Sequence, residues 1–136
     1  MGIADFGLWI DGAKRILPYM NAEEFKKRTK AFALRVIRLC EVLPKSRTAD
    51  VIGKQLLRCG TSVGANYRSA CRAKSPADFI AKMAIVEEEC DEAIYWMELI
   101  VESGMMDEKH IADLRAEANE ILSMGVASIK TARSRK

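Results

Sequence analysis

Apolar side chains recur every three or four residues along most of this chain, which is the spacing of one face of an α-helix. The first such stretch opens at Asn21 with the residues NAEE, which have the form of a capping box, and it ends before Pro44. The second stretch runs from about Thr48 to Arg72 with a continuous apolar stripe. Each stretch therefore predicts an amphipathic helix.

The second half of the chain repeats this pattern. Residues 75–78 read SPAD, which places a capping serine before a proline at the first helical position. The helix that follows should end near Gly104, and a fourth apolar stripe begins near Asp107 or Glu108. Four amphipathic helices with short connections predict an all-α, antiparallel up-down four-helix bundle.

Two glycines interrupt the second helix, although a glycine in a helix interior costs about 0.5–1 kcal/mol relative to alanine. Gly60 and Gly64 lie four residues apart, so both face the same neighbour. We expect close packing there, either in the core of the bundle or at a subunit interface, with Thr61, Ser62 and Asn66 hydrogen-bonding across the gap. The full tight-packing or interface set is Gly60, Gly64, Asn66, Tyr67 and Trp96.

The charges divide the chain into a basic half and an acidic half. Residues 26–74 hold 13 Lys and Arg against 2 Asp and Glu, a net charge of +11. Residues 75–120 hold 3 Lys and Arg against 13 Asp and Glu, a net charge of −10. Such asymmetry indicates either pairing between the two halves or an anionic partner for the basic half.

The basic residues of the first two helices fall into two groups. Arg58 and Arg68 are expected to form structural ion pairs with Glu89 and Glu92 of the third helix. The other cations are expected to face solvent or nucleic-acid phosphates, and they are Lys26, Lys27, Lys30, Arg35, Arg38, Lys54, Arg72 and Lys74. For Arg72 and Lys74, pairing inside the bundle is an equal alternative.

Metal and catalytic sites find little support in the sequence. The four cysteines contain no C-x-x-C pair and His110 is the single histidine, so a zinc site lacks ligands. Glu89 and Glu92 have the spacing of a bundle carboxylate site, but no histidine follows at the required position. We therefore expect no enzyme activity, no metal and no cofactor, and we expect the cysteines to be small buried thiols.

Several motifs resemble a known family. The sharpest are QLLR at 55–58, TSVGANYR at 61–68, DFIAK at 78–82 and EAIYWMEL at 92–99. From about Glu24 to Arg133 the chain resembles the bacterial four-helix bundle proteins of intervening sequences in large-subunit ribosomal RNA genes, the S23 ribosomal protein-like family. The resemblance implies a homo-oligomeric ring, typically a pentamer, with RNA binding as the suspected role and no enzymatic activity.

The accessory variability proteins of diversity-generating retroelements look like relatives of this family. They are basic pentamers that bind nucleic acid and a reverse transcriptase. The resemblance therefore adds a reverse-transcriptase-type partner to the expectations for this chain.

Residues 1–19 have no counterpart in the family pattern, which opens near Met20. We expect a disordered extension or a mis-assigned start there, and a bundle domain over residues 20–136. We do not expect a signal peptide in this segment, because Asp5 and Asp11 interrupt its apolar residues. No apolar run approaches the length of about 20 residues that crosses a bilayer, so we expect a cytoplasmic protein without a membrane partner.

Two hypotheses for function follow. The first is a non-catalytic, ring-forming bundle that binds structured RNA or another nucleic acid through a basic surface. The second is a protein-interaction scaffold whose basic and acidic helices pair internally, with no nucleic-acid ligand.

Overall fold

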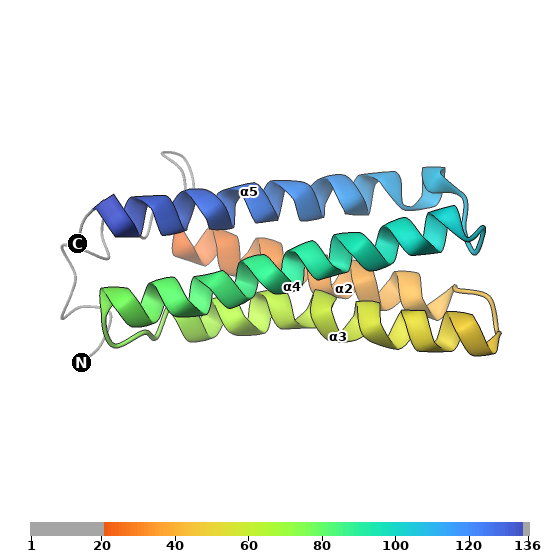
Figure 1. Ribbon diagram of the computed structural model, residues 1–136, viewed down its shortest axis with the longest axis horizontal. Coiled ribbons are helices and arrows are strands. Elements are labelled where there is room, and N and C mark those ends of the chain that lie inside the picture. Colours follow the sequence, from red (N-terminus) through yellow and green to blue (C-terminus); the bar gives the residue numbers. More distant parts are fainter. Residues whose placement is uncertain (1–20, 135–136) are drawn as a thin grey trace.

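Residues 21–134 fold into four long α-helices, α2 (Ala22–Glu41), α3 (Arg47–Ala70), α4 (Pro76–Glu102) and α5 (Ala112–Ser134). The computed structural model describes residues 21–134, and no β-strand occurs within that range. Successive helices run in opposite directions, and α5 packs back against α2 to close the bundle (Figure 1). The all-α fold is confirmed, whereas the expectation for residues 1–19 falls outside the described part of the chain.

Local hydrogen bonds fix the starts of two helices where the sequence predicts them. The side chain of Asn21 accepts a hydrogen bond from the backbone N–H of Glu24 at 2.9 Å, and the carboxylate of Glu24 accepts one from the backbone of Asn21. The hydroxyl of Ser75 accepts a hydrogen bond from the backbone N–H of Asp78 at 3.0 Å. Both caps satisfy backbone donors that a helix start would otherwise leave unpaired.

The remaining helix ends differ from the predictions by a few residues. Helix α3 begins one residue early because the Ser46 side chain caps it, and it stops at Ala70 instead of Arg72. Gly104 has a φ of 81°, the left-handed conformation that lets the chain turn away after α4. The fourth helix is preceded by one short 3₁₀ turn, η2 (Glu108–His110), before α5 begins.

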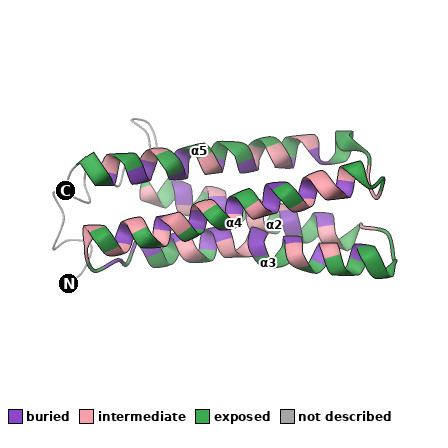
Figure 2. Cartoon of the chain, in the orientation of Figure 1, coloured by how far each residue is buried: buried purple, intermediate pink, exposed green. Residues whose placement is uncertain are grey.

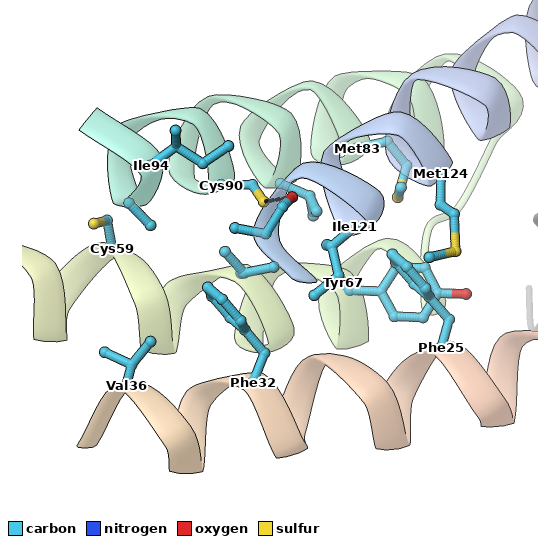
Figure 3. Close-up of a cluster of buried hydrophobic side chains, with 14 of the residues drawn as sticks. Phe25, Phe32, Val36, Cys59, Tyr67, Met83, Cys90, Ile94, Ile121 and Met124 are labelled. Atoms are coloured by element: carbon cyan, nitrogen blue, oxygen red, sulfur yellow. Dashed lines mark hydrogen bonds between the residues drawn. The ribbon is translucent and has the colours of Figure 1, made fainter. Parts of the chain in front are cut away.

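The core lies along the common axis of the four helices. Buried positions follow the inward faces of all four, and exposed positions follow the outward faces (Figure 2). Phe25 of α2 meets Tyr67 of α3 edge to face, with ring centroids 4.5 Å apart. Side chains from α4 and α5, including Cys90 and Ile121, point into the same interior (Figure 3). Burial raises the pKa of the Tyr67 phenol.

Helices α2 and α3 approach each other closely at the two glycines. A Cβ atom on Gly60 would lie 2.9 Å from both methyl carbons of Val36, and one on Gly64 would lie 3.1 Å from the hydroxyl of Thr29. Thr29 is fully buried, and its hydroxyl donates to the Phe25 carbonyl of its own helix at 3.0 Å. The glycines therefore permit a contact distance between α2 and α3 that larger residues would prevent.

The polar residues beside the glycines do not hydrogen-bond across the gap, so that expectation is wrong. The hydroxyl of Thr61 donates to the Leu57 carbonyl at 2.7 Å, and that of Ser62 donates to the Arg58 carbonyl at 2.7 Å. The Asn66 amide likewise donates to the carbonyl one turn earlier. Short polar side chains inside a helix commonly bond back to their own i−4 carbonyls, and here that local partner is closer than the neighbouring helix.

The glycine contact predicts opposite effects for two alanine substitutions. Gly60→Ala forces the Val36 methyls to move, so we expect it to lower the free energy of unfolding by about 1–3 kcal/mol. A Cβ on Gly125 of α5 meets nothing within 4 Å, so Gly125→Ala should raise it by about 0.5–1 kcal/mol through helix propensity. Urea denaturation of both variants measures the difference. Equal stabilisation by both substitutions would contradict the close approach.

Candidate nucleic-acid interface

A groove of about 460 Å³ runs between α2 and α3. Lys26, Lys27 and Lys30 stand on its α2 side, and Arg68 stands on its α3 side. Its floor is made of small residues, among them Gly64. The same small residues that let the two helices approach therefore leave a shallow channel between two rows of cations.

The groove continues over α3 toward the start of α4. A second hollow of about 500 Å³ is lined by Ala65, Arg68, Ser69, Arg72 and Lys82. Ala65 and Arg68 line both hollows, so the two form one surface. We call it the basic groove, and its cations are Lys26, Lys27, Lys30, Arg68, Arg72 and Lys82.

Four of these six cations have no carboxylate within 4.0 Å among residues 21–134. They are Lys27, Lys30, Arg68 and Arg72. The other two form short-range pairs within their own helices, Lys26 with Glu23 at 3.1 Å and Lys82 with Asp78 at 2.8 Å. The groove therefore carries an excess of positive charge that the described chain does not neutralise.

Asp78 has a second use at this end of the bundle. It accepts a hydrogen bond from the Lys74 backbone N–H at 3.0 Å, and this bond follows the Lys82 contact in lowering the pKa of Asp78. The carboxylate thus ties the loop between α3 and α4 to the first turn of α4. Lys74 itself is exposed in that loop and lines neither hollow.

The expected ion pair of Arg68 with the acids of α4 is wrong. Within the described residues, Arg68 has no salt bridge and lies in the basic groove. An α-helix turns by about 100° per residue, so the ten residues from Arg58 to Arg68 leave the two side chains about 80° apart around α3. This rotation places Arg68 on the side of α3 that faces α2, away from α4.

Arg58 does reach both acids of α4. Its guanidinium contacts a Glu89 carboxylate oxygen at 3.2 Å and also pairs with Glu92. The indole N–H of Trp96, one turn further along, donates to the same Glu92 carboxylate at 3.1 Å. Trp96 is half-buried and touches the ring edge of the exposed Tyr95. This network joins α3 to α4 on the outside of the bundle.

Three other residues that were predicted to contact nucleic acid lie outside the basic groove. Lys54 is exposed on α3 and lines neither hollow of the basic groove. Arg35 and Arg38 lie in a separate cleft at the opposite end of α2, which α5 and η2 complete. The structure therefore brings together Lys26, Lys27, Lys30 and Arg72 of the predicted set, and it adds Arg68 and Lys82.

Sequence reasoning missed an ion pair that joins α2 to α5. Arg28 of α2 binds Glu117 of α5 through two parallel hydrogen bonds of 2.7 and 2.8 Å, and it also contacts Glu120 at 2.8 Å. The hydrogen bond to Glu117 raises the pKa of Arg28 further above its ordinary value. The positions of the two residues could have predicted this pair. Arg28 and Glu117 each flank the apolar stripe of their own helix, and an up-down bundle places the first and fourth helices side by side.

The thiols pack as apolar side chains. Cys59, Cys71 and Cys90 are buried, Cys40 is half-buried, and all four are unbridged. The Cys90 thiol donates to the Ala118 carbonyl of α5 at 3.1 Å (Figure 3). Burial raises the pKa of Cys59 and of Cys90 to about 12. Over residues 21–134, no group of three or more His, Cys, Asp or Glu side chains is arranged to hold a metal ion.

These features define the protein as a four-helix bundle with a basic groove between α2 and α3. A family model described as 23S rRNA-intervening sequence protein matches residues 22–127, and the chain belongs to that family. None of the described helices is both long and apolar enough to span a membrane.

The similar proteins include one whose crystal structure is solved. It is a protein of unknown function from the S23 ribosomal protein family of Bacteroides thetaiotaomicron, with 34% identity and a TM-score of 0.75. The match covers 80% of this chain and 97% of that one. No curated protein matches the chain.

The buried thiols predict a loss of stability at alkaline pH. Both folded thiols have a pKa near 12, whereas an unfolded cysteine ionises near pH 8.5. Their stabilising contribution is therefore complete below about pH 8.5 and is lost as the pH rises toward about 12. Between about pH 9 and 11 each thiol makes the free energy of unfolding fall by about 1.4 kcal/mol per pH unit. Cys90→Ala should therefore make the slope shallower by that amount. Urea denaturation across that range measures both slopes, and equal slopes would contradict the raised pKa of Cys90.

Proposed function

We propose that this protein is a non-catalytic module that binds structured RNA, or another nucleic acid of the same backbone charge, through the basic groove. The observation that carries the proposal is the cluster of Lys27, Lys30, Arg68 and Arg72, which have no carboxylate partner among residues 21–134. Neutralising phosphates with such cations releases counterions and supplies most of the affinity in sequence-independent binding. Membership of a family described by an rRNA intervening sequence agrees with this partner.

The shape of the groove favours a phosphate backbone over a base. Its floor of glycine, alanine, serine and threonine lets a backbone come close to α3. No aromatic side chain is among the described residues that line it, so it offers no platform for base stacking. From Thr61 to Arg72 the helix rises about 16 Å, so the groove is long enough to contact more than one phosphate of a strand.

Internal pairing accounts for little of the basic charge. Of the 13 Lys and Arg in residues 26–74, only Arg28 and Arg58 contact an acid of α4 or α5 within the described chain. The alternative scaffold, in which basic and acidic helices neutralise each other inside one bundle, would need many more such contacts. This count therefore favours an external anionic partner.

We further propose that the bundle assembles as a ring. Ile37 and Leu57 are exposed on the basic helices, and Ile85 and Tyr95 are exposed on the acidic α4. Two different faces with opposite charge and exposed apolar residues suit a head-to-tail contact, which forms a closed ring when the rotation between copies permits it. These residues lie outside the basic groove, so the ring and the groove are compatible.

The nucleic-acid proposal predicts a defined salt dependence. We expect a hairpin RNA to bind with a log–log salt slope of about −4, because four uncompensated cations each neutralise one phosphate. The double variant Lys27→Gln/Arg68→Gln should flatten that slope by about 2. Fluorescence anisotropy from low to moderate salt measures both values.

The matched control removes the same charge elsewhere. Lys45→Gln/Arg47→Gln changes two exposed cations at the other end of the bundle, which line neither hollow, and it should leave the slope within about 0.5 of wild type. An equal loss in both double variants would mean that only net charge matters. No binding at low salt would exclude the proposed function.

The ring proposal predicts the mass of the protein in solution. We expect light scattering to give a multiple of the monomer mass, and Leu57→Asp/Tyr95→Asp to shift it toward the monomer with helical content retained. Val126→Asp introduces a single aspartate on the outer face of α5, where Val126 is 40% exposed, and should leave the mass unchanged. A monomeric wild-type protein at micromolar concentration would overturn the ring.

A further inference from the structure

The second basic site of the bundle lies at the opposite end of α2. A cleft of about 630 Å³ opens between the last turns of α2, η2 and the start of α5. Arg35 and Arg38 line one side, and Lys109 and His110 line the other. None of these four has a carboxylate within 4.0 Å among residues 21–134.

The bottom of this cleft differs from the basic groove because it is apolar. Leu39 of α2 and Leu114 of α5 form the buried base, and Val42 and Met106 extend it toward solvent. Cations therefore surround a patch of hydrocarbon. Such a site is complementary to an anion that carries a flat or apolar group, and bare phosphate would leave the hydrocarbon uncovered.

We propose that this cleft binds one unpaired nucleotide. Its phosphate pairs with Arg35, Arg38 and Lys109, and its base covers the apolar floor between Leu39 and Leu114. Guanidinium planes and apolar side chains both stack on bases, and single-stranded nucleotides are the parts of RNA that proteins hold in this way. An acyl chain fits less well, because the cleft is open to solvent and Val42 at its edge is 67% exposed.

The remaining polar group of the cleft gives the site a preference among bases. Asp113 lines it and has no basic group within 4.0 Å among the described residues. A carboxylate accepts hydrogen bonds and cannot donate them, so it suits a base that presents an exocyclic amine. Acidic side chains accept from the N4 amine of cytosine, whereas uracil has a carbonyl at the same position.

Helix α2 places this cleft and the basic groove on one path. From Lys27 to Arg38 the helix makes about three turns, so the two side chains point within about 20° of each other and lie about 16 Å apart. A few unpaired nucleotides can span that distance. This inference rests on the proposed function, because it takes the nucleotide from an RNA that is bound in the basic groove. The nucleotide would belong to a single-stranded segment that continues from the structured part of that RNA.

The test uses mononucleotides, which do not depend on the basic groove. We expect cytidine monophosphate to shift the amide resonances of residues around Leu39 and Leu114 in titrations followed by two-dimensional NMR. Arg35→Gln/Arg38→Gln should weaken that binding at least tenfold, because each arginine loses a charged hydrogen bond. Lys130→Gln/Arg133→Gln removes two exposed charges at the far end of α5 and should leave the affinity unchanged.

Two comparisons separate the parts of the proposal. Cytidine monophosphate should bind more tightly than uridine monophosphate, and Asp113→Asn should reduce the difference. Inorganic phosphate that binds as tightly as the nucleotide would overturn the base contact. No nucleotide binding, with Arg35→Gln/Arg38→Gln instead changing the mass of the oligomer, would assign the cleft to a second copy of the chain.

The outcome is distinguishable from failure of the proposed function. A cleft that binds cytidine monophosphate, in a protein whose groove does not bind hairpin RNA, would retain the nucleotide site and exclude the groove. If the groove binds RNA, a hairpin with a cytidine extension should bind tighter than the blunt hairpin, and Arg35→Gln/Arg38→Gln should remove only that gain. If the blunt hairpin binds as tightly as the hairpin with the cytidine extension, the proposal that a single strand runs from the groove to the cleft is overturned.

Discussion

The close approach of α2 to α3 is the constraint on which the rest of the molecule depends. A β-carbon on Gly60 would force the Val36 side chain to move, and one on Gly64 would press tightly against Thr29. The contact brings the cationic side chains of two helices to one narrow floor, where larger residues would have separated them. Like charges at that spacing repel each other, so the arrangement costs stability that the packed core must offset.

The bundle uses its arginines in two different ways. Arg28 and Arg58 bridge neighbouring helices, and each contacts two carboxylates. Arg28 is the more buried, with 25% of its side chain exposed against 50% for Arg58, so its loss would leave Glu117 nearly buried and unpaired. These two residues tie α5 to α2 and α4 to α3, whereas four of the six cations of the basic groove have no carboxylate within 4.0 Å in the described chain.

Much of the fold was predictable because its determinants are local. The Asn21 box and the Ser75 cap each act within a few residues, and both are found in the structure. The candidate site was less predictable because it depends on angles around a helix. Arg68 was expected to face α4, but helical drift over ten residues turns it toward α2. Lys82 joins the groove only because the loop before α4 returns the chain to Arg72.

The same drift explains why one helix can serve two basic sites without merging them. Lys26 and Arg35 are nine residues apart, or half a turn out of phase, so they face α3 and α5 respectively. Lys27 and Arg38 are eleven residues apart and nearly in phase, so they stand on the outer face between those two sides. The core stripe of Phe25, Phe32 and Val36 occupies the opposite side of α2. Burial thus fixes the rotation of the helix, and that rotation determines which cations line the groove and which line the cleft.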